Sequence, residues 1–237
     1  MGEKLCVVIP VFNQADSIRS VLDKWDEELS RLGADYEIRP YNDGSLDASL
    51  AVMKSLAATH PRISVRTKEH GGHGQTILTG YREAVRDGFD WIFQLDATDE
   101  MGPGRFDELW SRRDDYDLLV GTRDGRRQTW LRRLVSAVSR GCVRIFYGRG
   151  VWDVNTPYRL MRVKAFAHYF EAMPLSTQTP NVLISGVAAR DGMRWYETKV
   201  PPRAWGPAAR SVRFLRLAKA ALRSFAQTIA FSRVGAE

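Results

Sequence analysis

Three carboxylates lie close together in the segment Asp96-Ala97-Thr98-Asp99-Glu100, directly after an apolar run. Carboxylates at this spacing repel one another unless a cation or a cationic ligand neutralises them. Carboxylate oxygens beside a phosphate favour Mg²⁺ or Mn²⁺. We therefore predict a divalent metal site at Asp96, Asp99 and Glu100. The alternative is an acidic loop that precedes a helix starting near Gly104, because Asp and Glu are common at helix starts.

Two other polar segments follow apolar runs, and each allows a structural and a functional interpretation. Asn42-Asp43-Gly44-Ser45-Leu46-Asp47 suits a turn in which Gly44 adopts a positive φ and Ser45 or Asp47 caps a helix. His70-Gly71-Gly72-His73-Gly74 has neither the P-loop ending nor the dinucleotide-binding spacing, and its histidines are not spaced as a preformed metal site. Its glycines would let backbone amides approach a diphosphate, or the segment is a solvated loop.

The elements that would position these segments alternate along the first half of the chain. Apolar runs predict strands at Leu5–Val11, Tyr36–Tyr41, Ile63–Lys68, Trp91–Asp96 and Leu118–Thr122. Segments of helical period predict helices at Ala15–Leu32, Asp47–Thr59, Gln75–Arg86 and Arg105–Arg113. This alternation predicts a mostly parallel sheet, in which ligands bind beyond the carboxyl ends of the strands. The polar segments, including Pro10-Val11-Phe12-Asn13-Gln14 after the first strand, should therefore converge on one edge.

Beyond Asp124 the alternation is predicted to stop. An Arg-rich amphipathic stretch covers Thr129–Phe146, a strand covers Arg194–Val200, and a basic helix covers about Val212–Phe231. Both basic stretches could lie on an anionic membrane surface with Arg at the headgroups. The alternative for each is an ordinary helix that packs one face on the sheet.

The composition limits the class of protein. With 237 residues, 44% of them hydrophobic, the chain suits one compact α/β domain. Residues 1–100 hold 11 Lys and Arg against 17 Asp and Glu, whereas residues 101–237 hold 24 against 11, so the basic half must accommodate anions. The sequence has no apolar run near the ~20 residues that span a bilayer, and Cys6 and Cys142 suit reduced thiols. We therefore expect a cytoplasmic protein, with any attachment to the cytoplasmic membrane face being peripheral.

Taken in order, these segments resemble glycosyltransferase family 2 over nearly the whole chain. The family's Pro-x-Tyr/Phe-Asn start, Asp-Asp-Gly-Ser turn, Gly-rich segment and Asp-x-Asp signature correspond to Pro10-Val11-Phe12-Asn13, Asn42-Asp43-Gly44-Ser45, Gly71–Gly80 and Asp96-Ala97-Thr98. The resemblance implies a single α/β domain over residues 1–237 with the Rossmann-like GT-A fold. Residues 1–123 would bind the nucleotide sugar, residues 124–211 would bind the acceptor, and residues 212–237 would form a basic amphipathic helix.

Downstream segments are similar to the subgroup that includes dolichyl-phosphate mannosyltransferases and bactoprenol glucosyltransferases. These segments are Val120-Gly121-Thr122-Arg123, Asp153-Val154-Asn155-Thr156-Pro157-Tyr158-Arg159-Leu160-Met161 and Pro201-Pro202-Arg203-Ala204-Trp205-Gly206. The resemblance implies transfer of a hexose, with inversion, from a UDP- or GDP-linked sugar to a dolichyl or undecaprenyl phosphate at the membrane surface.

The resemblance also implies roles for individual residues. The nucleotide sugar would be held by Pro10, Phe12, Gln14, Asp43, Gly44, Gly74 and Asp96, with Asp43 at the base. Asp96 and Glu100 would surround the metal and the donor diphosphate, and anionic oxygens of acceptor or donor would be bound by Arg123, Arg133 and Arg203. Thr98 occupies the position of the signature's second Asp, so either Asp99 and Glu100 take over metal binding or the site is weakened.

The chemistry of the acceptor decides whether a base is needed. A phosphate monoester is largely a dianion at neutral pH and attacks without a base, whereas a hydroxyl acceptor would need one, for which Asp153 is the candidate. The alternative role of Asp153 is that of a turn residue, and a soluble glycan, protein or small molecule stays open as the acceptor. Two other classes are a non-catalytic nucleotide-sugar-binding protein, which Thr98 would suit, and a nucleic-acid-binding module, which the acidic sheet edge disfavours.

Overall fold

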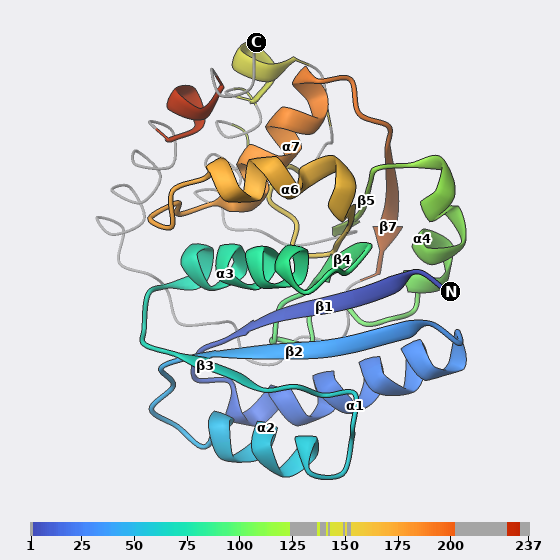
Figure 1. Cartoon of the computed structure of the whole chain (residues 1–237), viewed down its shortest axis with the longest axis vertical. Coiled ribbons are helices and arrows are strands. Elements are labelled where there is room, and N and C mark those ends of the chain that lie inside the picture. Colours follow the sequence, from blue (N-terminus) through green and yellow to red (C-terminus); the bar gives the residue numbers. More distant parts are fainter. Residues whose placement is uncertain are drawn as a thin grey trace.

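The computed structural model describes residues 2–123, 137, 141, 143–148, 150, 153–201 and 227–232. Within them a seven-stranded sheet crosses the molecule, with helices on both faces (Figure 1). The strands are β1 (Lys4–Val11), β2 (Asp35–Asp43), β3 (Arg66–Lys68), β4 (Trp91–Gln94), β5 (Leu118–Arg123), β6 (Arg159–Arg162) and β7 (Trp195–Val200). The helices are α1 (Ala15–Arg31), α2 (Ser49–Ala57), α3 (His73–Arg86), α4 (Phe106–Arg112), α6 (Val163–Ala172) and α7 (Pro180–Arg190), with a 3-10 turn at Arg113–Asp115.

The strand order is β3-β2-β1-β4-β6-β5-β7, and neighbouring strands are parallel except at β6, which is antiparallel to both β4 and β5. The carboxyl ends of β1 to β5 therefore lie on one side of the sheet, which we call the carboxyl edge. Because β6 runs the other way, its first residue, Arg159, pairs with Gln94 at the end of β4. The loop that precedes β6 reaches the carboxyl edge for this reason.

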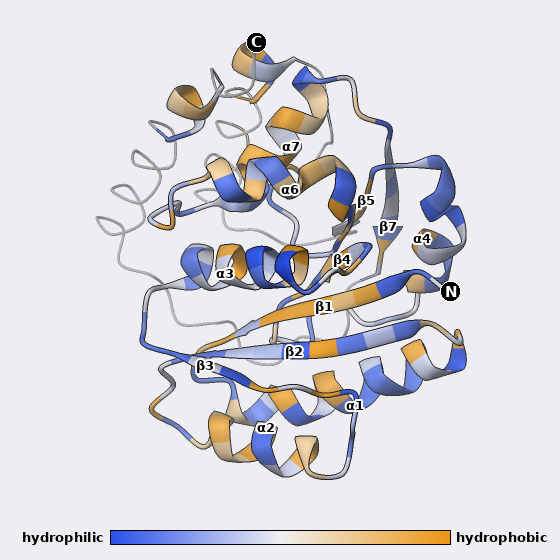
Figure 2. Cartoon of the chain, in the orientation of Figure 1, coloured by the Kyte–Doolittle hydropathy of each residue, from blue (hydrophilic) through white to orange (hydrophobic). Residues whose placement is uncertain are grey.

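Alternating side chains along β1 divide the core between the two faces of the sheet. Leu5, Val7 and Ile9 belong to the cluster that includes α1, α2 and α4, whereas Cys6 and Val8 belong to the cluster that includes α3, α6 and α7. Figure 2 shows β1 hydrophobic over most of its length, while α1 carries hydrophobic and hydrophilic residues along different parts of its surface. Burial of both sheet faces explains why the parallel strands read as continuous apolar runs.

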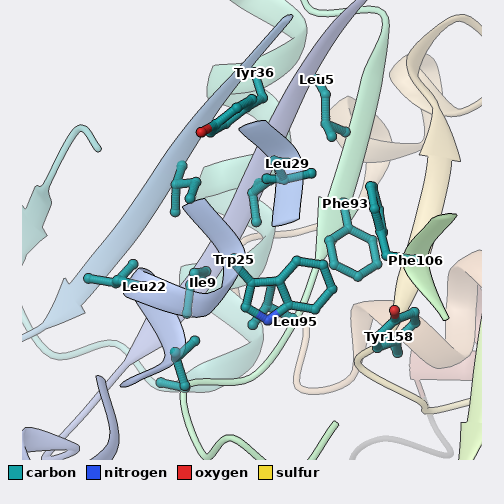
Figure 3. Packing of buried hydrophobic residues seen from close by; sticks show 14 of the residues in the cluster. Leu5, Ile9, Leu22, Trp25, Leu29, Tyr36, Phe93, Leu95, Phe106 and Tyr158 are labelled. Atoms are coloured by element: carbon teal, nitrogen blue, oxygen red, sulfur yellow. The ribbon is translucent and has the colours of Figure 1, made fainter. Parts of the chain in front are cut away.

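A buried aromatic cluster lies beneath the carboxyl edge. The ring of Trp25 on α1 has its centroid 4.9 Å from Phe93, 5.4 Å from Phe106 and 5.8 Å from Tyr158 (Figure 3). Loss of a buried aromatic ring of this size costs about 3–5 kcal/mol of unfolding free energy. Tyr158 also lines the pocket beside Asp96, so this cluster fixes one wall of the candidate site.

The first half of the chain forms the predicted elements with shifts at their ends. Of the predicted strand at Ile63–Lys68, Arg66–Lys68 forms β3, while Ile63 makes an isolated bridge to Ile38 of β2. The strand predicted to reach Asp96 ends at Gln94, which leaves Asp96 in the following loop. Helix α3 begins at His73, two residues before its predicted start. The prediction of a mostly parallel α/β sheet is confirmed.

The second half departs from the prediction. The alternation does not stop at Asp124, because residues 153–201 form β6, α6, α7 and β7. The strand predicted at Arg194–Val200 is confirmed as β7. Most of the two predicted basic stretches, at Thr129–Phe146 and Val212–Phe231, lies outside the described residues, and residues 143–147 and 227–231 within or beside them are helical. In the part of the chain that the structure describes, none of the helices has the length and apolar character needed to cross a membrane.

Candidate functional site

The turns after β1 and β2 are hydrogen-bonded to each other. The N–H of Asn13 donates to Ser45 Oγ at 3.1 Å, and the N–H of Leu46 donates to Asn13 Oδ1 at 2.8 Å. The N–H of Ala15 donates to Asp47 Oδ2 at 3.1 Å. Asn13 has a φ of 53°, in the left-handed region that Asn tolerates better than most residues. These contacts make the two turns one rigid part of the carboxyl edge.

Asp43, the last residue of β2, is saturated by donors from the next loop. Its carboxylate lies 2.6 Å from Lys68 Nζ and 2.9 Å from His70 Nδ1, and it accepts the N–H groups of Gly71 and Gly72 at 2.9 Å each. Burial alone would raise the pKa of Asp43, but the hydrogen bonds from Lys68 and the glycine backbone outweigh it and lower the pKa. Asp43 therefore holds the β3–α3 loop in shape, and a nucleobase that contacted it would have to displace one of these donors.

An exposed aromatic pair lies at the same edge. The rings of Phe12, which follows β1, and His70, which follows β3, have centroids 4.4 Å apart at 31°. Phe12 is 41% exposed and the His70 side chain 56%. Exposed ring faces of this kind stack well on a nucleobase. Of the other residues expected here, Pro10 is buried within β1, and Gln14 is half-buried with its Oε1 accepting from Ser17.

Gly44 and Gly74, which are expected to bind the nucleotide sugar, are each required by the local structure. Gly44 adopts a φ of +69° in the turn after β2, as the sequence predicted. A Cβ on Gly74 would lie 2.3 Å from the carbonyl oxygen of Thr177, in the segment before α7. Gly74 thus allows a close approach of α3 to this segment.

The loop after β4 is anchored to α1. Ser17 Oγ donates to the carbonyl oxygen of Ala97 at 2.6 Å, and the Asp99 carboxylate binds Lys24 and Ser20. Asp99 has a φ of 54°, and this left-handed backbone directs its side chain to α1. The Asp99 carboxylate is thereby paired with a cation on α1.

Asp96 is the carboxylate that the structure leaves open at this edge. Its Oδ1 is buried and has no hydrogen-bond partner within the described ranges, and it lies 3.7 Å from Nε2 of His73. Asp96, Thr98 and Glu100 line one small pocket together with Tyr158. A buried carboxylate oxygen without a donor suits a cation. Across the described residues, however, His, Cys, Asp and Glu form no group of three or more that could hold a metal.

A buried arginine supports the loop that precedes β6. The guanidinium of Arg159 donates to the carbonyl oxygens of Thr156 at 2.9 Å, Asn181 at 3.0 Å and Val154 at 3.3 Å. Burial lowers the pKa of Arg159 to about 10, and the negative charge of Asp153 partly offsets this effect. The cation therefore persists at neutral pH and braces the loop that carries Asp153. This role of Arg159 was not predicted, although an Arg at the start of a buried strand is a signal for it.

A buried polar network connects this loop to α3. The Tyr81 hydroxyl lies 3.0 Å from Gln94 Oε1, which also accepts from Asn181 Nδ2 at 2.8 Å. Asn181 Nδ2 lies 3.5 Å from the carbonyl oxygen of Thr156. α3, β4 and α7 are thus joined directly beneath the carboxyl edge.

Of the three arginines expected to bind anionic oxygens, the structure describes Arg123. Arg123 is the last residue of β5, so its backbone lies at the carboxyl edge. Arg133 and Arg203 lie outside the described residues. The structure places Asp96 and Glu100 in one pocket and joins Phe12 to Asp43 through His70.

The parallel sheet, its one antiparallel strand and its polar carboxyl edge are those of GT-A glycosyltransferases. Residues 6–170 match the family described as glycosyl transferase family 2, and the chain belongs to this family.

One curated relative is an undecaprenyl-phosphate 4-deoxy-4-formamido-L-arabinose transferase from Enterobacter sp. (strain 638). It is 30% identical over 174 residues, which cover 72% of this chain and 51% of the relative. The chain therefore spans about half the length of this relative.

Solved structures share the fold over almost the whole chain. Glucosyl-3-phosphoglycerate synthase from Mycobacterium tuberculosis, in complex with Mn²⁺, UDP-glucose and phosphoglyceric acid, has a TM-score of 0.68 at 16% identity and covers 98% of this chain and 80% of its own. A mannosyltransferase from Pyrobaculum calidifontis, in complex with GDP-Man and Mn²⁺, has a TM-score of 0.64 at 15% identity and covers 97% and 64%. At these identities the similarity shows the fold alone.

Proposed function

We propose that this glycosyltransferase moves a hexose from a UDP- or GDP-linked sugar to a polyprenyl phosphate at a membrane surface, with inversion of the anomeric carbon. The observation that carries the proposal is the Asp96 carboxylate, whose buried Oδ1 is unpartnered among the described residues at the carboxyl edge of the sheet. The relative at 30% identity is named for transfer to undecaprenyl phosphate, which supports the acceptor.

The donor would lie across the ends of β1, β2 and β4. Its base would stack on the Phe12–His70 pair, above the loop that Asp43 holds in shape. Mg²⁺ or Mn²⁺ at Asp96, with Glu100 in the same pocket, would neutralise the charge of the departing diphosphate. Structures of the same fold contain Mn²⁺ with a nucleotide sugar, which supports a divalent metal.

The acceptor phosphate would need a cationic cradle rather than a base. As a dianion, its oxygen can attack the anomeric carbon while the bond to the diphosphate breaks and the diphosphate leaves with the electron pair. Arg123 at the end of β5, with Arg133 and Arg203, would bind the acceptor oxygens, because guanidinium groups match phosphate bidentately.

A second candidate is a hydroxyl acceptor on a soluble molecule. A solved structure of the same fold contains phosphoglyceric acid, which supports an acceptor of this kind. Asp153, on the loop braced by Arg159, would then be the base that removes the hydroxyl proton.

Delivery of a lipid-linked acceptor would involve peripheral contact with an anionic membrane. The segment Val212–Phe231 contains Arg213, Arg216 and Arg223 among apolar residues. Charge reversal at these three positions should weaken co-sedimentation with vesicles that contain phosphatidylglycerol. Unchanged partitioning would contradict the membrane contact.

The decisive experiment measures donor binding and then transfer. A panel of UDP- and GDP-linked sugars is titrated by calorimetry with and without Mn²⁺ or Mg²⁺, and a short-chain polyprenyl phosphate or a soluble phosphorylated acceptor is then added. Metal-dependent binding followed by transfer to the polyprenyl phosphate is expected. Transfer to the soluble acceptor alone would favour the second candidate, and absence of donor binding would exclude both.

A further inference from the structure

The signature segment leaves Asp96 without the neighbouring carboxylate that the family pattern supplies. Thr98 stands at that position, and a neutral hydroxyl is a weaker ligand for a divalent cation than a carboxylate. The next carboxylate, Asp99, is directed to α1, where it binds Lys24 and Ser20. Glu100 lines the same pocket as Asp96, and any further strong ligand for the cation must come from elsewhere at the edge.

His73, the first residue of α3, faces Asp96 across this edge. Its Nε2 lies 3.7 Å from Asp96 Oδ1, the same buried oxygen that has no hydrogen-bond partner within the described part of the chain. A separation of 3.7 Å is too long for a hydrogen bond. It suits two ligands of one cation, because metal bonds of about 2.1 Å to each atom allow the ligand atoms to lie up to about 4 Å apart.

The backbone before α3 sets the place of His73. Gly72 has a φ of +90°, which L side chains rarely adopt, and the chain turns into α3 at this residue. The N–H groups of Gly71 and Gly72 donate to the carboxylate of Asp43 and tie the turn to the end of β2. Asp43 thus fixes the loop that presents His73 to Asp96.

We propose that Asp96 and His73 together hold the divalent cation, with His73 replacing the second Asp of the signature. This rests on the proposed function, in which the donor diphosphate supplies further oxygen ligands. An imidazole nitrogen in the ligand set favours Mn²⁺ over Mg²⁺, because Mg²⁺ prefers oxygen ligands. We therefore expect the site formed by Asp96 and His73 to bind Mn²⁺ more tightly than Mg²⁺.

The test measures Mn²⁺ binding to the full chain at neutral pH, from the loss of the electron paramagnetic resonance signal of free Mn²⁺, with and without UDP or GDP. His73→Ala should weaken Mn²⁺ binding at least about tenfold, as loss of a metal ligand does. His168→Ala, at an exposed position on α6, is the matched control and should bind as the wild type does. Thr98→Asp, added to His73→Ala, should restore Mn²⁺ binding and tighten Mg²⁺ binding.

Wild-type Mn²⁺ affinity in His73→Ala overturns the proposal, and so does an equal loss in His168→Ala. The His73 side chain is 57% exposed, so its removal should not disturb packing, and a thermal unfolding curve verifies this.

Nucleotide-sugar binding is measured on the same samples and tests the proposed function separately. Mn²⁺ binding that depends on His73, without nucleotide-sugar binding, would support the metal pair and contradict the proposed function. Nucleotide-sugar transfer with Mn²⁺ binding independent of His73 would contradict the pair alone.

Discussion

Lys68 Nζ lies 2.6 Å from Asp43 Oδ1, and the two residues pair directly at the carboxyl ends of β2 and β3. The Asp43 side chain is 3% exposed and the Lys68 side chain 19%. Since the same carboxylate accepts the N–H groups of Gly71 and Gly72, this ion pair links the edge of the sheet to the start of α3.

Asp43→Asn should lower the unfolding free energy at neutral pH and make it less dependent on pH. The pKa of Asp43 is lowered in the folded protein, so its charge stabilises the fold above its unfolded pKa of about 4, and this contribution is lost as the pH falls through the folded pKa. At neutral pH we expect a loss of about 1.5–3 kcal/mol of unfolding free energy. The measurement is urea unfolding from about pH 7 down to about pH 2, with the exposed Asp23→Asn as control. If the unfolding free energies of the wild type and Asp43→Asn differed by the same amount at every pH, the stabilising role of the Asp43 charge would be contradicted.

Asp96→Asn and Asp99→Asn should separate metal binding from loop anchoring. Asp96→Asn should weaken Mn²⁺ binding by at least about tenfold and abolish transfer, because its oxygen is the one left open at the edge. Asp99→Asn should stay within about threefold of wild type, since its partner is Lys24 and Asn tolerates the left-handed backbone. Calorimetric Mn²⁺ titration of both variants checks this. A loss in Asp99→Asn equal to that in Asp96→Asn would make Asp99 a metal ligand after all.

The first half of the fold could be predicted because its signals are local. Strands buried on both faces give short apolar runs, and α1 and α3 each bury one stripe of residues. α7 gave no such signal because Pro180–Ala188 is buried all round, so hydrophobic period carries no information there. β6 spans only Arg159–Arg162 and begins with a buried Arg, which a search for apolar runs passes over.

The sequence predicts which side chains of the candidate site lie at the carboxyl edge, because these follow the strands. Phe12, Asp43 and Asp96 follow parallel strands, so their convergence follows from topology. The contacts of each side chain do not follow from topology. Asp99 contacts Lys24 from a backbone with positive φ, and His73 lies beside Asp96 after a turn at Gly72. Such contacts depend on three-dimensional geometry that residue spacing does not encode.

Arg159→Met should destabilise the fold and disturb the loop at Asp153. The carbonyl oxygens of Thr156, Asn181 and Val154 would lose their charged donor, and Val154 and Thr156 would keep only Ser185 Oγ and Asn181 Nδ2. This loss should lower the unfolding free energy by at least about 2 kcal/mol. Arg159→Lys keeps the charge but loses the planar fork, so an intermediate loss is expected. Chemical unfolding of both variants checks the order. Arg19→Met, at an exposed position on α1, serves as control, and an Arg159→Met variant as stable as this control would contradict the bracing role.

Phe12→Ala and His70→Ala should each weaken nucleotide binding by about tenfold, because stacking of a base on an aromatic ring contributes about 1–3 kcal/mol. The two rings contact each other, so the double variant should lose less than the sum of the single losses. Calorimetric titration with UDP and GDP measures all three variants. Leu46→Ala is the control, because Leu46 lies at the same edge and is 91% exposed. Wild-type affinity in Phe12→Ala would remove the aromatic pair from the donor site, whereas a selective loss for UDP or for GDP would show which base the pair accepts.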